Sequence, residues 1–121
     1  METLNLLEIK PLLESSPVAL GTVMPDGKPN IIGVAAVKVV SDDQVLITDN
    51  YMNQTIQDIS WNKNVCLLVW DNEMRGQKIV GEAEYYKEGE WLEYVKKMPE
   101  NKDYSPKGAI LVKVTKIIKS K

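Results

Sequence analysis

Short apolar runs, many of them alternating with polar residues and separated by turn-forming residues, dominate this chain. Alternation with a period of two, rich in valine and isoleucine, predicts strands that are half-buried in a sheet. Six strands are expected, at residues 18–23, 29–40, 44–48, 65–70, 77–86 and 108–118. Pro-Asp-Gly at residues 25–27 and Ser-Asp-Asp at residues 41–43 are turn signals, so the first three strands predict an antiparallel meander.

Three stretches repeat their apolar residues at helical spacing instead. Residues 3–16 predict a helix in which Pro11 either introduces a kink or starts a second turn. Shorter helices are expected at residues 54–61 and 90–98, and the latter is amphipathic and ended by Pro99. With 121 residues, the chain predicts a single domain, mainly β, in which six antiparallel strands and about three short helices form a closed or partly closed barrel.

The sequence contains no histidine, which limits the kinds of catalytic and metal-binding site that it can form. This excludes Ser-His-Asp and Cys-His catalysis, histidine-ligated zinc and haem held by a proximal histidine. The single cysteine, Cys66, lies in an apolar run and predicts a buried hydrophobe, not a nucleophile. No catalytic side chain and no metal site are therefore expected, and any demanding chemistry must come from a bound cofactor or from carboxylates.

Charge and hydropathy indicate whether the protein binds nucleic acid or a membrane and where in the cell it is expected. The net charge is −2 and acidic and basic residues are mixed, so no footprint for nucleic acid stands out. A lysine cluster could attract RNA but is better explained as a solubilising edge; it comprises Lys113, Lys116, Lys119 and Lys121. No apolar run approaches the roughly 20 residues that span a bilayer, and the first residues lack the basic start of a signal peptide. The sequence predicts a cytoplasmic protein without membrane contact.

The most suggestive polar segment joins the strand at residues 44–48 to the helix at residues 54–61. A helix start offers free backbone N–H groups and the positive end of the helix dipole, which together can bind a phosphate. The Thr55 hydroxyl and the Gln54 side-chain amide would add donors. Because such residues more often serve as plain helix caps, an anion site and simple capping both remain open.

Several short motifs, in this order, resemble the pyridoxamine 5'-phosphate oxidase-like FMN-binding split barrels. They are Gly21-Thr22-Val23, Asp26-Gly27-Lys28-Pro29-Asn30, Val45-Leu46-Ile47-Thr48-Asp49-Asn50, Gln54-Thr55 and Asn62-Lys63-Asn64-Val65. The resemblance spans about residues 4–118, and the length is closest to that of the small bacterial FMN-binding proteins. It implies a six-stranded antiparallel split β-barrel that forms a homodimer, with FMN bound at the subunit interface.

The resemblance also implies which residues bind FMN. Thr55 matches the hydroxyl of a Lys/Arg-Thr/Ser pair that holds the phosphate, and Gln54 stands at the cationic position. The strand facing ribityl and phosphate corresponds to Asn30, Ile31, Ile32, Gly33 and Val34, and the segment along the isoalloxazine to Thr48, Asp49, Asn50 and Tyr51. Residues 104–107 match a loop that reaches the ring from the partner subunit, often with an aromatic such as Tyr104. Because Gln54 is neutral, a further cation is expected from Lys78, Arg75 or Lys107.

The implied function is that of an FMN-binding flavoprotein performing electron or hydride transfer, hence a candidate FMN-dependent oxidoreductase of unknown substrate. True pyridoxamine-phosphate oxidase activity is not expected, because the second set of phosphate-binding residues and the substrate histidine of that enzyme have no counterpart. The alternative is a binding or dimerisation module that has lost FMN or takes another phosphorylated or deazaflavin ligand, which the missing cation favours. Haem handling by a related barrel is disfavoured by the lack of histidine.

Overall fold

The computed structural model describes residues 5–120. Its strands are β1 (Val18–Val23), β2 (Pro29–Val34), β3 (Val37–Val39), β4 (Gln44–Asp49), β5 (Asn64–Trp70), β6 (Gly76–Tyr86) and β7 (Gly108–Ser120). Its helices are α1 (Lys10–Ser15), α2 (Gln54–Trp61) and α3 (Glu90–Lys96), with short 3-10 helices η1 (Leu6–Ile9) and η2 (Pro99–Asn101). No helix in this part of the chain is long and apolar enough to cross a membrane.

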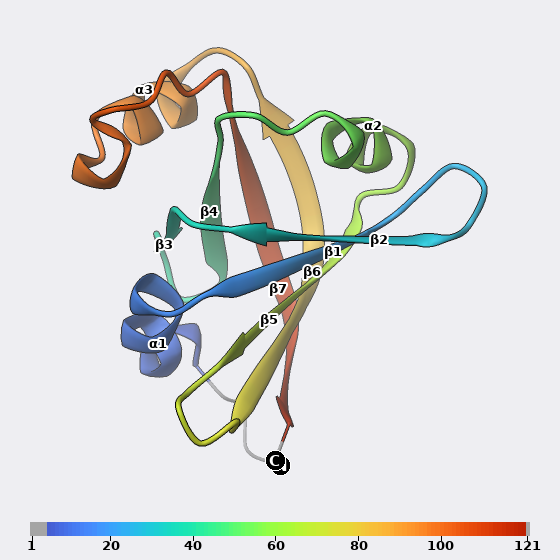
Figure 1. Cartoon of the computed structure of the whole chain (residues 1–121), viewed down its shortest axis with the longest axis vertical. Coiled ribbons are helices and arrows are strands. Elements are labelled where there is room, and N and C mark those ends of the chain that lie inside the picture. Colours follow the sequence, from blue (N-terminus) through green and yellow to red (C-terminus); the bar gives the residue numbers. More distant parts are fainter. Residues whose placement is uncertain (1–4, 121) are drawn as a thin grey trace.

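The strands form one antiparallel sheet in the order β2-β1-β5-β6-β7-β4-β3. The sheet curls strongly, with α1 beside one end and α2 and α3 at the other (Figure 1). The mainly β antiparallel architecture and the three helices predicted from the sequence are confirmed. Pro11 lies in the first turn of α1, so it starts a new helix after η1 and does not kink a continuous one. Residues 3–4 of the predicted first helix lie outside the described residues.

The prediction of one strand over residues 29–40 is wrong. β2 pairs with β1, whereas β3 pairs with β4, so the two halves of that run belong to opposite edges of the sheet. The chain passes from one edge to the other at Ala35 and Ala36, and the Ala36 carbonyl accepts a hydrogen bond from the Thr48 amide (3.1 Å). The described chain therefore has seven strands, not six, and the predicted three-strand meander does not form.

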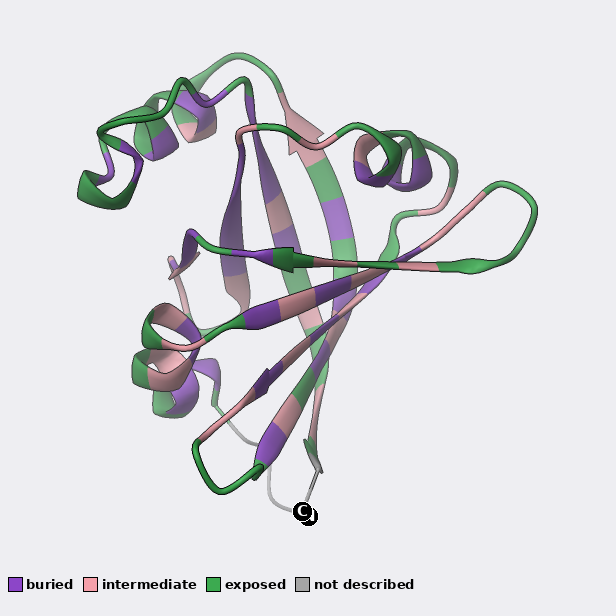
Figure 2. Ribbon diagram, viewed as in Figure 1, coloured by how far each residue is buried: buried purple, intermediate pink, exposed green. Residues whose placement is uncertain are grey.

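The core fills the inside of the curl, as the alternation along the strands predicts. On β1, for example, Val18, Leu20 and Thr22 are buried while the residues between them are partly exposed. A second apolar cluster packs α3 against the other face of β4, through Leu46, Leu92 and Val95. In Figure 2, β4 has the colour of buried residues over most of its length. β4 is consequently buried on both faces, and its last residues are held firmly where the polar loop to α2 begins.

Cys66 lies on β5 with its side chain on the partly exposed face of the sheet. Burial raises the pKa of its thiol, with the Lys78 ammonium acting in the opposite direction. A raised pKa lowers the fraction of thiolate, which is the nucleophilic form. Cys66 is thus half-buried and not fully buried as predicted, and its raised pKa disfavours the reactive thiolate.

Candidate functional site

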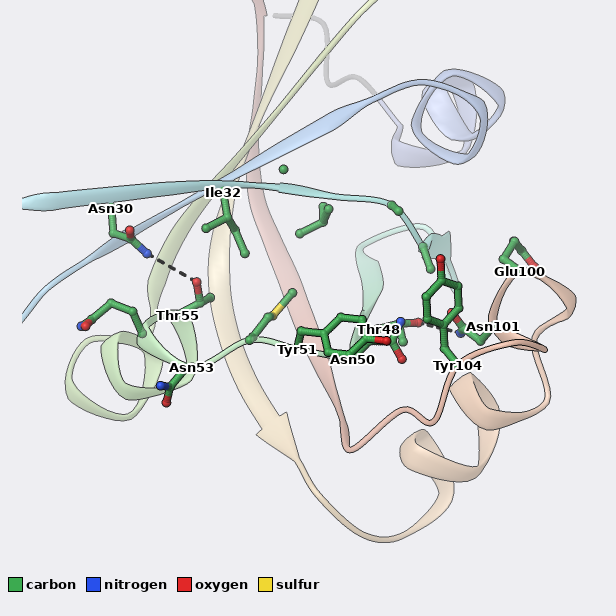
Figure 3. A pocket seen from close by; sticks show the side chains of 16 residues that line it. Asn30, Ile32, Thr48, Asn50, Tyr51, Asn53, Thr55, Glu100, Asn101 and Tyr104 are labelled. Atoms are coloured by element: carbon green, nitrogen blue, oxygen red, sulfur yellow. Dashed lines mark hydrogen bonds between the residues drawn. The ribbon is translucent and has the colours of Figure 1, made fainter.

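A cavity of about 540 Å³ opens between β2, the end of β4, the start of α2 and the segment around η2 (Figure 3). This volume falls within the usual range for small-molecule sites. Its lining combines apolar groups, two tyrosines, several neutral polar groups and one glutamate. These residues are Asn30, Ile32, Gly33, Val34, Ala35, Ala36, Thr48, Asn50, Tyr51, Met52, Asn53, Gln54, Thr55, Glu100, Asn101 and Tyr104.

Most of the residues predicted to bind a cofactor line this one cavity. They are Asn30, Ile32, Gly33, Val34, Thr48, Asn50, Tyr51, Gln54, Thr55 and Tyr104. Ile31 alternates to the outer side of β2 and is 68% exposed, so it does not line the cavity. Lys78 lies on β6, opposite Leu68 and Ile118, and is also outside the lining. Asp49 and Lys107 lie behind the lining loop, as described below.

The start of α2 forms one end of the cavity. Its N-cap residue, Asn53, makes no side-chain capping hydrogen bond. Thr55 is only 2% exposed, and its hydroxyl oxygen accepts a hydrogen bond from Asn30 Nδ2 (3.4 Å; Figure 3). Uncapped N–H groups beside a hydroxyl are suitable donors for an anion.

Behind this end lies a buried carboxylate, Asp58, which the structure leaves 0% exposed. It accepts hydrogen bonds from Gln54 Nε2 (2.8 Å) and from the Thr22 hydroxyl (2.7 Å). Asn30 Nδ2 is in turn 3.3 Å from Thr22 Oγ1. Asp58 forms no ion pair with any described lysine or arginine, and both side-chain groups that donate to it are neutral.

A second buried carboxylate, Asp49, fixes the loop between β4 and α2. Its Oδ1 accepts from the Met52 amide (2.7 Å) and its Oδ2 from the Tyr85 hydroxyl (2.7 Å). Lys107 Nζ donates to the Met52 carbonyl and lies 4.0 Å from Asp49 Oδ2. Gly108 makes room for this arrangement, because a Cβ there would lie 2.1 Å from the Tyr85 hydroxyl oxygen. Asp49 therefore anchors the lining loop from behind.

Replacing Tyr85 by phenylalanine tests this anchor. Burial and the neighbouring Asp49 carboxylate raise the pKa of the Tyr85 hydroxyl above its ordinary value of 10.0. A raised folded-state pKa stabilises the protein fully below pH 10, and that stabilisation is lost as the pH rises further. We expect Tyr85→Phe to lower the free energy of unfolding by about 1–3 kcal/mol at pH 7, because Asp49 loses a donor.

The two proteins should also differ in alkaline solution. Urea unfolding between pH 9 and pH 11.5 should show a steeper decline in stability for the unmodified protein than for Tyr85→Phe. Tyr86, whose pKa is raised mainly by its hydrogen bond to Glu84, contributes equally to both and serves as an internal control. Parallel declines would show that Tyr85 does not keep its proton through Asp49.

The opposite end of the cavity is built on Asn101, which is almost fully buried. Its Nδ2 donates to Thr48 Oγ1 (2.9 Å; Figure 3) and to the Val95 carbonyl (2.8 Å), so η2 is tied to the end of β4. Tyr104 follows and meets Tyr51 edge to face, with ring centroids 6.2 Å apart. Tyr104 thus lines the cavity of its own chain, whereas the resemblance places the matching residue at the partner's site.

Over residues 7–121, the sequence matches the family model described as pyridoxamine 5'-phosphate oxidase. The chain belongs to the pyridoxamine 5'-phosphate oxidase family. The sequence is also similar to that of the uncharacterized protein MJ0282 of Methanocaldococcus jannaschii. The two are 38% identical over 109 residues, which cover 87% of this chain and 73% of that protein. The family resemblance inferred from the motifs is thereby confirmed.

Solved structures with this fold place the chain among the split barrels. HupZ of Group A Streptococcus superposes with a TM-score of 0.87 at 27% identity, covering 99% of this chain and 94% of HupZ. An FMN-binding protein of Syntrophomonas wolfei subsp. wolfei superposes with a TM-score of 0.80 at 17% identity, covering 96% of this chain and 86% of that one. At that lower identity the likeness shows the shared fold alone.

In this member of the pyridoxamine 5'-phosphate oxidase family, the described residues present no lysine or arginine to the cavity. Among the described lining residues, Glu100 is the one with a charged side chain. Arg75 is paired with Asp71 and Glu73 in the turn between β5 and β6. Of the three cations suggested by the sequence, Lys107 alone approaches the lining, and it is engaged with the loop.

Sequence reasoning missed several lining residues and the whole layer behind them. The missed lining residues are Ala35, Ala36, Met52, Asn53, Glu100 and Asn101. Thr22 and Asp58 carried a usable signal, because each places a polar side chain on an inward position of its element. Asn101 had no such signal, since it lies in an irregular segment whose packing depends on α3.

Proposed function

We propose that this chain forms a homodimeric FMN-binding flavoprotein that transfers electrons or hydride, with each FMN bound at the subunit interface. The observation that carries the proposal is the cavity at the start of α2. There an uncapped helix start and the Thr55 hydroxyl form a polar end, and a longer apolar part continues from it. The family assignment makes FMN the ligand to test first.

The residues present suit FMN in three respects. The start of α2 and Thr55 offer donors for the phosphate. Ile32, Val34 and Ala36 supply apolar surface for a planar ring system. Asn50 Oδ1 is buried without a hydrogen-bond donor from the described residues, and such an acceptor is costly unless a ligand or water supplies a donor. The N–H of the flavin pyrimidine edge is a donor of the required kind.

Bound FMN would itself supply the redox chemistry, accepting or passing on a hydride or electrons. The protein's residues need only bind it, orient it and limit access of water. Met52, Tyr51 and Tyr104 would shield the ring end, while Asp49 and Asn101 keep the two lining segments in place. No catalytic side chain is required, in agreement with a sequence that contains no histidine.

The homodimer is supported by two aromatic rings left uncovered where they line the cavity. Tyr51 is 81% exposed and Tyr104 50%, and their rings contact each other edge to face. Exposed aromatic side chains at a site are typical of an interaction surface. We expect sedimentation velocity at micromolar concentration to give a dimer, and Tyr51→Ser to weaken it. A monomeric unmodified protein at that concentration would contradict the proposed interfacial site.

One experiment tests FMN binding directly. The purified protein should show the yellow absorbance of a flavin or, if isolated without ligand, should quench the fluorescence of added FMN. Mass analysis of the released ligand identifies it. A colourless protein that also fails to take up FMN would refute the proposal. The lack of a lysine or arginine among the described lining residues favours the alternative, a module that has lost FMN. If that module takes another phosphorylated or a deazaflavin ligand instead, the same mass analysis would identify it.

A further inference from the structure

A continuous set of hydrogen bonds runs from the buried Asp58 carboxylate to the cavity. It passes through the Thr22 hydroxyl and the Asn30 side-chain amide and ends at the Thr55 hydroxyl. The four residues come from β1, β2 and α2, so the chain of bonds connects three elements that meet at the polar end of the cavity. We call Asp58, Thr22, Asn30 and Thr55 the Asp58 relay.

Asp58 sets the direction of every bond in the relay. Both Asp58 oxygens accept hydrogen bonds, Oδ1 from Gln54 Nε2 and Oδ2 from the Thr22 hydroxyl, so the hydroxyl hydrogen of Thr22 is committed to Asp58. The Thr22 oxygen is then left to accept, and it accepts from one hydrogen of Asn30 Nδ2. The second hydrogen of that amide goes to Thr55 Oγ1. Both hydrogens of the Asn30 amide are therefore used within the relay.

Thr55 is the end of the relay and faces the cavity. Its oxygen accepts from Asn30, so its own hydroxyl hydrogen remains to be donated. No acceptor for that hydrogen is found among residues 5–120, although Thr55 is 2% exposed and lines the cavity. A group in the cavity that accepts hydrogen bonds and donates none would satisfy it, and a phosphate oxygen is such a group.

We propose that Thr22 and Asp58 are positioning residues that orient the Thr55 hydroxyl toward the ligand, so that the cavity selects a phosphate through neutral donors without a positive charge. This inference rests on the proposed FMN site. It accounts for how a phosphate could be recognised in a cavity to which residues 5–120 contribute no lysine or arginine. Recognition then depends on the direction of hydrogen bonds, and FMN is separated from riboflavin by its acceptor oxygens.

Thr22→Val tests the relay at a residue that does not line the cavity. Valine retains the shape of threonine but removes the donor to Asp58 and the acceptor for Asn30. We expect FMN affinity to fall about fivefold, because the Thr55 hydroxyl loses its fixed direction, while riboflavin affinity changes less than twofold. Thr22→Ser restores the hydroxyl and should return the ratio of the two affinities to within about twofold of the unmodified protein.

The results separate this inference from the proposed function. If the unmodified protein binds neither flavin, the proposed function fails. If it binds FMN but Thr22→Val lowers both affinities equally, or neither, Thr22 is only structural and the relay is refuted. A purely structural loss would appear as a lower melting temperature with an unchanged FMN-to-riboflavin ratio.

A measurement on the unmodified protein covers the case in which Thr22→Val does not fold. Recognition by neutral donors predicts that FMN affinity changes less than about threefold between roughly 0.05 and 0.5 M salt, since screening acts on charge pairs. A fall of about tenfold or more over that range would show that a lysine or arginine, for instance from the partner subunit, neutralises the phosphate. That result would overturn the inference while leaving FMN binding established.

Discussion

Thr55→Val should lower FMN affinity by about 10- to 100-fold, because a hydrogen bond to a charged group contributes about 1.5–3 kcal/mol. The substitution removes the hydroxyl at the end of the Asp58 relay and leaves the apolar lining unchanged. Riboflavin, which has no phosphate, should bind both proteins with similar affinity. Fluorescence titration with each flavin measures the two constants, and the free energy of unfolding should change by only about 1 kcal/mol, since Asn30 loses one acceptor.

Thr115→Val is a matched control for that experiment. Thr115 lies on β7, is exposed, and donates its hydroxyl to the Val80 carbonyl (3.2 Å), away from the cavity. Its loss should leave both flavin affinities unchanged. If Thr55→Val also leaves FMN affinity unchanged, the phosphate does not bind at the start of α2, and the assignment of the polar end is wrong.

Gly81→Ala should destabilise the folded protein by about 3 kcal/mol or more. Gly81 lies where the register between β6 and β7 shifts, and a Cβ there would be 2.3 Å from the Lys113 carbonyl oxygen. A backbone atom cannot rotate away as a side chain does, so relief requires the two strands to separate. Urea denaturation followed by tryptophan fluorescence measures the loss.

Gly21→Ala provides the comparison, because it places the same methyl group on β1. There the nearest atoms, the Cys66 and Asn30 carbonyl oxygens, lie at 3.6 and 3.8 Å, which are ordinary contacts. Its effect on stability should stay within about 1 kcal/mol. Equal losses for the two variants would show that β6 and β7 adjust freely at the register shift.

Local sequence patterns were sufficient to predict most of the strands and the polar end of the cavity at the start of α2. The alternation on β1 and β6 and the Pro-Asp-Gly turn depend on neighbouring residues, and both were located from sequence. Neighbouring side chains on a strand point to opposite faces of the sheet. Because Ile79 is buried in the core, Lys78 next to it points away from the core. Lys78 was proposed as a phosphate ligand from charge alone, and the structure leaves it outside the cavity.

Features that depend on distant residues could not be predicted in this way. The break at Ala35 and Ala36 carries no proline or glycine, and it arises because the curled sheet brings β2 to one edge and β3 to the other. Likewise, the contact between Thr22 and Asp58 joins residues far apart in sequence. The inward position of each residue on its own element could be inferred from periodicity, but their contact depends on the packing of α2 against β1.

The connection at Ala35 and Ala36 also determines where the curled sheet is held together least strongly. Between β2 and β3 the two sheet edges are joined by the polypeptide itself and not by a ladder of hydrogen bonds. The cavity lies along this seam, with residues of β2 on one side and the end of β4 on the other. A ligand bound in the cavity would contact both edges of the sheet and connect them without a covalent bond. We therefore expect amide hydrogen exchange along β2 and β3 to slow when a ligand binds, because binding stabilises the two unpaired edges of the sheet.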